Sequence, residues 1–384
     1  MSTAAGPLPP DGPTNGRRVG LELVPRPEDG TPGPTKKDFT SDAQVRWCPG
    51  CGDYAILAAV QSFLPELGIK RENVVCVSGI GCSSRFPYYL DTYGLHSIHG
   101  RAPAIATGLA TSRPDLNVWV VTGDGDALSI GGNHLIHALR RNVNLTILLF
   151  DNRIYGLTKG QYSPTSEPGK VTGSSPMGSV DAPFNPLSLA LGAEASFVAR
   201  TIDNDRKHLT AVLREAVAHR GSSLVQIYQN CPIFNDGAFE VLQDKQSAQA
   251  RLVPLSHGEP IRFGPTWATT EGGDGLGAKG VVRGPDGHLA VVDVADLAAD
   301  GRGTGAVLVH DAHDPDPTTA FALSRLDDAS FAHVPIGIFR DVHRPAYDDQ
   351  VREQVDGARA AAGGRATDDA LADLLAGSDT WTVA

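Results

Sequence analysis

The sequence predicts an α/β fold with a mainly parallel sheet and helices on both of its faces, followed by a C-terminal extension. Between residues 42 and 240, apolar strand patterns alternate with amphipathic helix patterns, which is typical of strands joined by helical crossovers. Such crossovers cover both faces of the sheet. At 384 residues the chain can form one large domain or two ordinary ones, each with a sizeable core.

The strand and helix patterns follow a regular order. Residues 53–69 have the spacing of an amphipathic helix that ends near Gly68, because glycine is favoured just after a helix. A strand, a helix and a second strand, at 116–126, 131–142 and 144–152, form a β-α-β unit. The other elements predicted here are a strand at 73–84 that runs into a glycine turn, a helix at 209–219 and a strand at 223–232.

Composition shifts divide the chain into three regions. Residues 1–40 are rich in proline and glycine and lack apolar periodicity, which predicts a disordered tail. Residues 41–240 form the predicted main domain. Residues 241–384 are expected to pack as an extension on this core or on a partner subunit. Within the extension we expect a strand at 305–311, a helix at 318–326 and a short helix at 370–377.

Charge and hydropathy exclude several classes of function. No apolar run approaches the roughly 18 residues of a membrane helix, and the first residues lack the apolar core of a signal peptide, so we expect a cytoplasmic protein without a membrane span. The net charge of -11 argues against nucleic-acid binding. The five cysteines, an odd number, should be reduced and favour metal, cluster or catalytic use over disulfides.

Two cysteines stand close together in the stretch WCPGCGDY, residues 47–54. A reduced pair of this spacing can ligate zinc, bind an iron–sulfur cluster or exchange a disulfide. CPGC precedes a predicted helix, as in a thioredoxin-like redox pair, but nothing else in the sequence indicates that fold. Another cysteine, Cys76, lies in the apolar run VVCVSG and is expected to be a small buried hydrophobic residue.

Polar residues follow the two strands of the β-α-β unit. Asp124 stands between Gly123 and Gly125, and Asn152 comes 28 positions later. Because both strands point the same way, these side chains should converge at one edge of the sheet. Their oxygens suit Mg²⁺, and the glycines would let the backbone approach a phosphate. The start of the next helix, at Gly131 and Gly132, would add affinity for an anion.

These motifs and their neighbours resemble a known family. GDG followed by an asparagine is the thiamine diphosphate motif of many 2-oxoacid enzymes, and residues 80–110 and 154–166 are similar to the beta subunit of 2-oxoacid:ferredoxin oxidoreductases. With CPGCGD in front, the resemblance is closest to the 2-oxoglutarate type. It extends from about Arg46 to Asp236 and implies a thiamine-diphosphate-binding fold. The implied reaction converts 2-oxoglutarate and coenzyme A to succinyl-CoA and CO₂, with electrons passed to ferredoxin.

The resemblance also implies roles for residues around the cofactor. Asp124 and Asn152 would be the side-chain ligands of Mg²⁺, and the Ile154 carbonyl would be its backbone ligand. Thr158 would lie near the diphosphate. The resemblance places His99, Gly100 and Arg101 beside the reactive end of the cofactor.

Four cysteines would hold one [4Fe-4S] cluster in this family. The matching positions are Cys48, Cys51, Cys82 and Cys231. Cys82 and Cys231 each follow a predicted strand, so they should reach the sheet edge that holds Asp124. A proline follows Cys231, as it follows the last cysteine of the bacterial ferredoxin ligand run. Zinc would accept the same four sulfurs.

The sequence holds no recognisable glutamate motif for activating thiamine. In related two-chain enzymes this residue comes from the alpha subunit, so the resemblance implies an alpha partner and an α2β2 assembly. Arg85 and Lys159 are the candidate cations for the distal carboxylate of the substrate. Pyruvate or branched-chain oxoacids are the alternative substrates, and a non-catalytic metal-binding scaffold built on the four cysteines is the alternative function.

The stretch VHDAHDPDP, residues 309–317, could suggest a metal site made from histidine and aspartate. Its prolines indicate a loop, and its spacing fits no helix face. We therefore interpret it as a polar loop that forms part of a lid or a subunit contact.

Overall fold

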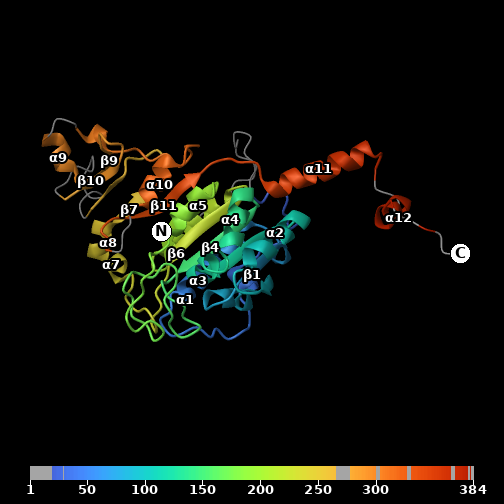
Figure 1. Cartoon of the computed structure of the whole chain (residues 1–384), viewed down its shortest axis with the longest axis horizontal. Coiled ribbons are helices and arrows are strands. Elements are labelled where there is room, and N and C mark those ends of the chain that lie inside the picture. Colours follow the sequence, from blue (N-terminus) through green and yellow to red (C-terminus); the bar gives the residue numbers. More distant parts are fainter. Residues whose placement is uncertain are drawn as a thin grey trace.

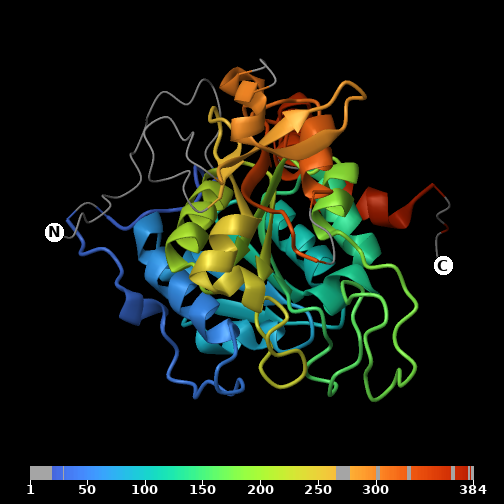
Figure 2. The same ribbon diagram turned by 90° about the vertical axis from the view of Figure 1, so that its left-hand side faces the viewer.

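The computed structural model describes residues 20–28, 30–264, 277–299, 303–326, 330–364, 368–378 and 381. In this part of the chain, no helix is both long and apolar enough to cross a bilayer. Figures 1 and 2 show a central sheet with helices packed on both of its faces.

An eight-stranded sheet forms the centre of the molecule, in the order β2-β1-β3-β4-β6-β5-β11-β7. The strand pairs from β2 through β5 are parallel, whereas β11 runs antiparallel to β5. This arrangement confirms the predicted mainly parallel α/β fold. The strands are β1 Val74–Ser78, β2 Tyr93–His96, β3 Asn117–Gly123, β4 Leu145–Asp151, β5 Phe197–Ile202, β6 Ser222–Tyr228, β7 Leu252–Leu255 and β11 Val334–Asp341.

Two apolar cores cover the two faces of the sheet. Alternate residues of one strand enter opposite cores: Val118 and Val120 of β3 pack with one core, and Trp119 and Val121 with the other. Cys76 is 1% exposed in the second core, as predicted. The first core lies under α2 Ala102–Ser112, α4 Gly132–Arg141, α5 Pro186–Gly192 and α10 Thr318–Ser324, and the second under α1 Asp53–Phe63 and α6 Arg206–Ala218.

The predicted elements of the main domain are present, with one shift at a site motif. The helix expected at 53–69 is α1 followed by a 3-10 turn, Leu64–Leu67, and Gly68 ends it with φ 60°. The strand expected at 116–126 ends at Gly123 instead, because the chain turns into a short helix, α3 Asp124–Leu128. Asp124 therefore begins a helix rather than ending a strand.

Part of the expected disordered tail is corrected. Residues 1–19 and 29 lie outside the described residues, but Leu21, Val24 and Phe39 are buried in the second core. Three apolar side chains in a stretch rich in proline and glycine are enough to dock it, even though they show no periodicity. The 3-10 helix Lys36–Phe39 carries the last of them.

The extension contributes two strands, β7 and β11, to the central sheet. A strand at 305–311 is not formed: a 3-10 turn, Thr304–Ala306, is followed by isolated bridges at Val307 and Val309. The helices expected at 318–326 and 370–377 are present as α10 and α12. The remaining elements are α7 Glu240–Gln243, α8 Lys245–Arg251, β8 Arg262–Phe263, β9 Lys279–Arg283, β10 Leu289–Asp293, α9 Val294–Ala299, α11 Tyr347–Ala361, α12 Asp368–Ala376, and 3-10 helices at Arg71–Asn73 and Ser83–Tyr89.

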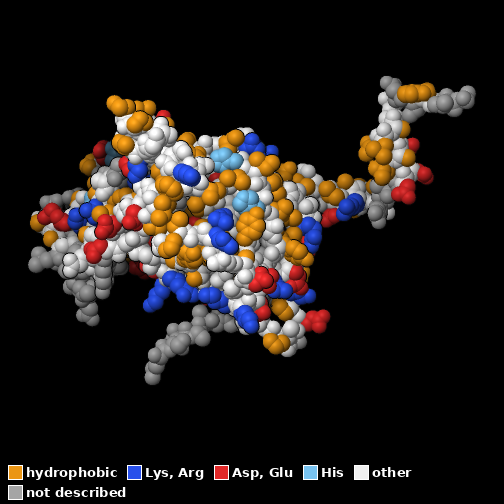
Figure 3. All heavy atoms as spheres, turned by 90° about the horizontal axis from the view of Figure 1, so that it is seen from below, with side chains coloured by type: hydrophobic (Ala, Val, Ile, Leu, Met, Phe, Trp, Pro, Cys, Tyr) orange, Lys and Arg blue, Asp and Glu red, His pale blue; other side chains and the backbone are white. Residues whose placement is uncertain are grey.

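The start of α11 is tied to the main domain by buried charges. Arg220 bonds to Asp348 and Asp349 in its first turn. Beyond that turn, α11 and α12 extend away from the body, as the labels in Figure 1 and the projecting arm in Figure 3 show. Strands β8, β9 and β10 form a separate antiparallel sheet in the extension.

Candidate active site

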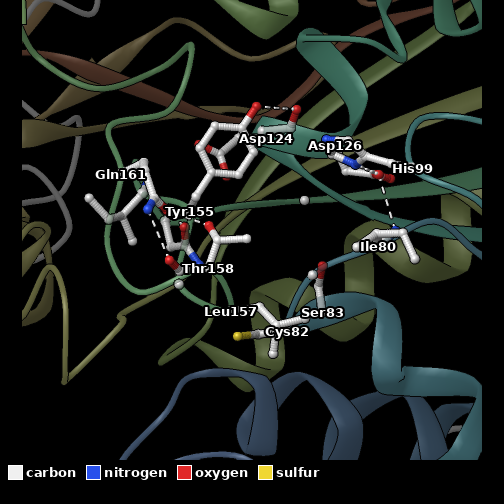
Figure 4. A pocket seen from close by; sticks show the side chains of 16 residues that line it. Ile80, Cys82, Ser83, His99, Asp124, Asp126, Tyr155, Leu157, Thr158 and Gln161 are labelled. Carbon is white, nitrogen blue, oxygen red and sulfur yellow. Dashed lines mark hydrogen bonds and ion pairs between the residues drawn. The ribbon is translucent and has the colours of Figure 1, made fainter. Parts of the chain in front are cut away.

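A cavity of about 460 Å³ lies at the carboxyl ends of four neighbouring strands. Ligands bind at this edge of parallel sheets because the segments that follow the strands converge there. Figure 4 shows side chains from these segments around the cavity. The segments after β2, β1, β3 and β4 contribute His99, residues 80–83, residues 123–126, and Asn152 with residues 154–158, and Gln161 completes the wall.

Asp124 is buried on the wall of this cavity, directly after β3. Its carboxyl group accepts hydrogen bonds from the Ser163 hydroxyl and, at 2.6 Å, from the Thr165 hydroxyl. Thr165 Oγ1 also lies 2.8 Å from the buried carboxyl group of Asp151. Burial and the nearby Asp151 raise the pKa of Asp124 above its usual range. A divalent cation at Asp124 would offset this unfavourable pairing.

The loop after β4 brings two further candidate ligands, Asn152 and Ile154, to the same cavity. Asn152 donates from its amide nitrogen to Gln229 Oε1 at 2.8 Å, which fixes the side-chain orientation. Its amide oxygen accepts from the Ile154 N–H at 3.2 Å and keeps a second lone pair. Asp124, Asn152 and Ile154 therefore line one cavity, as does Thr158, which donates to Gln161.

Arg153 anchors this loop to the extension. It has φ 57°, a left-handed conformation that is uncommon for a residue with a side chain. Its guanidinium carbon lies 4.2 Å from the ring centre of Phe331, with the rings of Phe239 and Tyr228 next to it. A guanidinium on aromatic faces is stabilised by cation–π attraction. These three rings form an aromatic cage around Arg153, and the cage holds the turn between Asn152 and Ile154 in place.

Glycines shape the cavity in two different ways. Gly81, with φ +118°, has no heavy atom within 4 Å of where a Cβ would stand, so it leaves open space in the wall. At Gly125 there is no room for a side chain, because a Cβ there would lie 2.2 Å from the Tyr155 ring. The Tyr155 hydroxyl donates to the Gly125 carbonyl at 2.9 Å. Gly131 and Gly132 do not line the cavity. Gly100 packs against Gly131, and the anion site expected at that helix start stays a prediction.

His99 and Arg101 differ in their placement. His99 lines the cavity, and its Nδ1 lies 2.5 Å from Oδ1 of Asp126. Arg101 stands just before α2, does not line the cavity, and donates to the Ile130 carbonyl at 3.3 Å. The carboxyl of Asp126 is buried, and its role was not foreseen from the sequence, although it is the second aspartate of GDGD.

Three of the predicted cluster cysteines meet beside the cavity. A Cβ on Gly156 would lie 3.3 Å from Cys82 Sγ and 3.7 Å from Cys231 Sγ, so both sulfurs face this glycine. The Cys51 sulfur accepts from Gln229 Nε2 at 3.3 Å, and the nearby Cys231 and Cys82 contribute to raising the pKa of its thiol. Gln229 thus contacts both Asn152 and Cys51, and joins the two halves of the site.

Cys48 lies at the exposed end of this group. The Cys51 N–H donates to the Cys48 carbonyl at 3.1 Å, and Gly50, with φ +83°, closes the turn, where a Cβ would lie 4.0 Å from the Pro232 ring. The CPGC turn therefore packs on the proline that follows Cys231. All five cysteines are free thiols.

Burial disfavours charge on the inner cysteines. It raises the pKa of the Cys51 thiol, and it raises that of Cys82 to about 12. Thiolates at these positions therefore need a positive partner such as a metal or cluster. In the described part of the chain, no three histidine, cysteine, aspartate or glutamate side chains are placed to hold one metal ion. This arrangement does not match the compact tetrahedron of sulfurs around zinc.

The predicted carboxylate clamp is not part of the cavity wall. Arg85 is half-buried, and its guanidinium donates to the Arg46 carbonyl at 3.3 Å. Lys159 is exposed, with φ 77°. Neither residue lines the cavity, and no glutamate does so among the described residues.

The histidines of residues 309–317 have local partners. His310 is 1% exposed, and its Nε2 bonds to the Ile338 carbonyl at 2.6 Å. His313 Nδ1 bonds to the Asp341 carbonyl at 2.6 Å. These bonds fasten the loop to β11, in agreement with a structural interpretation of the segment.

Comparisons with known proteins agree with the geometry. Residues 73–227 match the family described as thiamine pyrophosphate enzyme, C-terminal TPP binding domain. The chain is 61% identical over 368 residues to 2-oxoglutarate oxidoreductase subunit KorB of Mycobacterium tuberculosis, covering 96% of this chain and 92% of that protein. It is 46% identical over 188 residues to 2-oxoglutarate synthase subunit KorB of Archaeoglobus fulgidus, covering 48% and 69%.

A solved structure has the same fold. It is 2-oxoglutarate:ferredoxin oxidoreductase from Magnetococcus marinus with 2-oxoglutarate, coenzyme A and succinyl-CoA bound. The TM-score is 0.68 at 32% sequence identity, and the match covers 91% of this chain and 98% of that chain.

The fold and its cavity define a thiamine-pyrophosphate-dependent oxidoreductase subunit. Within this class, the chain belongs to the family of 2-oxoacid:ferredoxin oxidoreductase beta subunits, in the 2-oxoglutarate group. The family resemblance seen in the sequence is thereby confirmed.

Proposed function

We propose that this chain is the catalytic beta subunit of an enzyme that converts 2-oxoglutarate and coenzyme A to succinyl-CoA and CO₂, with electrons passed to ferredoxin. The main observation behind this proposal is that oxygen donors for a metal ion and cysteine sulfurs for a cluster meet at one cavity. Asp124, Asn152 and Ile154, which have oxygen donors, line it, and so does Cys82, whose sulfur lies beside Gly156 together with that of Cys231. A thiamine site beside an electron acceptor suits oxidative decarboxylation.

The cavity fits thiamine diphosphate with Mg²⁺. The three oxygen donors are hard ligands of the kind that Mg²⁺ takes beside a phosphate. The open position at Gly81 is one that a side chain would fill. Bound thiamine diphosphate supplies the nucleophilic carbon for the oxoacid carbonyl and accepts the electron pair left when CO₂ departs. Thr158 would contact the diphosphate, and His99 and Arg101 would lie on the side of the reactive end.

The cysteines fit a cluster that removes electrons one at a time. Cys48, Cys51, Cys82 and Cys231 would ligate one [4Fe-4S] cluster, whose size separates its sulfur ligands more than a single ion would. Three of these cysteines are close to one another, and the exposed Cys48 would complete the set. The cluster would then deliver the electrons to ferredoxin.

The cavity lacks a residue to activate thiamine. Because no described glutamate lines it, we propose that an alpha subunit supplies this carboxylate in an α2β2 assembly. Arg85 and Lys159 lie outside the wall, so their proposed contact with the distal carboxylate of 2-oxoglutarate depends on the assembled site.

Substrate turnover tests this proposal. The chain, assembled anaerobically with its alpha partner, should reduce ferredoxin with 2-oxoglutarate and coenzyme A, and kcat/KM should be lower with pyruvate or branched-chain oxoacids. The chain alone should be nearly inactive. A preference for pyruvate would mean that pyruvate, and not 2-oxoglutarate, is the substrate. Full turnover by the isolated chain would contradict the shared site, and no turnover with any oxoacid would favour a non-catalytic scaffold built on the four cysteines.

A further inference from the structure

We propose that Asp126 is a positioning residue that holds His99 with Nε2 as the proton-accepting nitrogen at the cavity. The inference rests on the proposed function, because it assigns a role within the same cavity. Its basis is the short contact of 2.5 Å between Oδ1 of Asp126 and Nδ1 of His99. Figure 4 shows this pair on the wall opposite Thr158.

The hydrogen bonds around Asp126 fix which ring nitrogen carries hydrogen. Oδ1 already accepts from the Gly100 N–H at 2.8 Å and from the Ile80 N–H at 3.1 Å. An oxygen that accepts two N–H groups is an acceptor for the imidazole as well, so Nδ1 of His99 is the donor. A neutral imidazole has one N–H, and Nε2 therefore keeps its lone pair.

The carboxyl group has little freedom to move. Asp126 is 2% exposed, and its Oδ2 accepts from the Thr122 hydroxyl at 2.7 Å. On the other side, Gly79 leaves no room, since a Cβ there would lie 1.8 Å from Oδ2. The His99 side chain is 38% exposed and stands edge-on to the Tyr155 ring. Asp126 is thus clamped, and it holds the imidazole at the cavity.

This arrangement suits proton transfer at one atom. A hydroxyl or acid group of a ligand in the cavity can give its proton to Nε2, and the buried carboxylate then stabilises the positive ring. The proton returns from Nε2 when the ligand oxygen needs it, so no electrons are exchanged. Asp126 takes no proton in this step, because its oxygens are held by four donors.

Chemical modification tests the pair without cofactor or turnover. Diethyl pyrocarbonate acylates an imidazole nitrogen that has a free lone pair. Residues 86–101 form one tryptic peptide that also holds His96, which is exposed and is an internal reference. In the full chain without cofactor, at about pH 8 where an ordinary imidazole is neutral, Asp126→Asn should slow modification of His99 about threefold relative to His96, because an uncharged amide polarises the ring less than a carboxylate and leaves Nε2 a weaker nucleophile. An unchanged ratio would overturn the proposal.

Asp341→Asn is the matched control. Asp341 is also a buried carboxylate bonded to a histidine, at 2.8 Å from His219 Nδ1, but it lies outside the cavity. This variant should lower the melting temperature and leave both the His99 to His96 ratio and kcat unchanged. If it slowed His99 as much as Asp126→Asn does, the effect would be a general loss of packing, and the proposed pair would fail.

A double-mutant cycle in the assembled enzyme gives the second test. Asp126→Asn should lower kcat about tenfold with little change in KM, and His99→Gln should lower it about a hundredfold. The double variant should be no slower than His99→Gln, because Asp126 acts through His99. If the loss of kcat in the double variant were the product of the losses in the two single variants, the proposal would be overturned. If Asp126→Asn slowed modification of His99 but the unmodified assembled enzyme turned over no oxoacid, the proposed function would be refuted, whereas the Asp126–His99 pairing would still stand.

Discussion

At the scale of single residues, close packing decides where the cavity is closed and where it is open. Gly125 carries the motif that suggested a phosphate approach, yet Tyr155 occupies the space where its side chain would be. The sequence could not show this contact, because Tyr155 is 30 positions away and comes from the loop after β4. A motif glycine can thus serve the packing of another residue.

Gly125→Ala should weaken cofactor binding. Its methyl group would displace the Tyr155 ring at a cost of about 1–3 kcal/mol, as for other overpacked sites. Thiamine diphosphate affinity with Mg²⁺, measured by calorimetry, should fall, and the double variant with Tyr155→Ala should recover part of it. Gly132→Ala is the control, since a Cβ at Gly132 meets no atom within 4 Å. Equal losses in both alanine variants would refute this account.

His208 on α6 makes stability depend on pH. Burial lowers its pKa below the usual 6.5, and its Nδ1 lies 2.9 Å from the Thr201 hydroxyl. The unfolded chain therefore takes up this proton at higher pH than the folded chain, so protonation favours unfolding. This part of the free energy of unfolding is present above about pH 6.5 and is lost as pH falls below that value.

His208→Gln should consequently lose less stability on acidification than the unmodified chain. Urea unfolding at about pH 8 and about pH 5.5 measures the difference. His96→Gln, a change at an exposed histidine, should behave like the unmodified chain. If both variants and the unmodified chain lost the same free energy of unfolding, His208 would not be the group responsible.

At the scale of elements, one loop joins the cofactor side of the site to the extension. Arg153 lies between the candidate ligands Asn152 and Ile154, and its guanidinium packs on Phe331, just before β11. Sequence patterns predicted the strands around the loop, because apolar periodicity is local. They could not predict the cage, because its aromatic rings come from three distant segments.

Arg153→Ala should loosen this loop and leave the fold intact. Loss of the cation–π contacts, worth about 0.5–2 kcal/mol, should raise the Kd for thiamine diphosphate with Mg²⁺ about tenfold. Arg113→Ala removes an exposed arginine that is paired with Asp115, and it should have no effect on Kd. An unchanged Kd in Arg153→Ala would show that the loop does not depend on the cage.

At the scale of the whole molecule, the sequence predicted four of the eight strands of the main sheet, β1, β3, β4 and β6. Strands β2, β5, β7 and β11 were not predicted. In β11, Gly337 and Arg340 interrupt the apolar pattern, and pairing with β5 and β7 completes the strand. The same reason explains why Leu21, Val24 and Phe39 were assigned to a disordered tail: their burial depends on helices elsewhere in the chain. Contacts between residues that are far apart in the sequence produce no periodic pattern in the local sequence.

In the candidate site, too, some residues could be predicted from the sequence and others could not. Asp124 and Asn152 were predicted to converge because parallel strands bring their ends together, whereas Cys82 was assigned from the family resemblance. Ser163, Thr165 and Asp126 were not predicted, since hydroxyl and carboxyl partners of this kind have no spacing signature. The run SPTS and the second aspartate of GDGD were the available signals.

Anaerobic EPR with metal analysis tests the central claim most directly. The chain assembled with its alpha partner should contain about four irons per chain and should show a reduced-cluster signal after addition of 2-oxoglutarate and coenzyme A. Cys231→Ser should lose iron and signal, whereas Cys76→Ala, a change at a buried core cysteine, should keep both. Zinc in place of iron, with no signal on addition of substrate, would contradict the account.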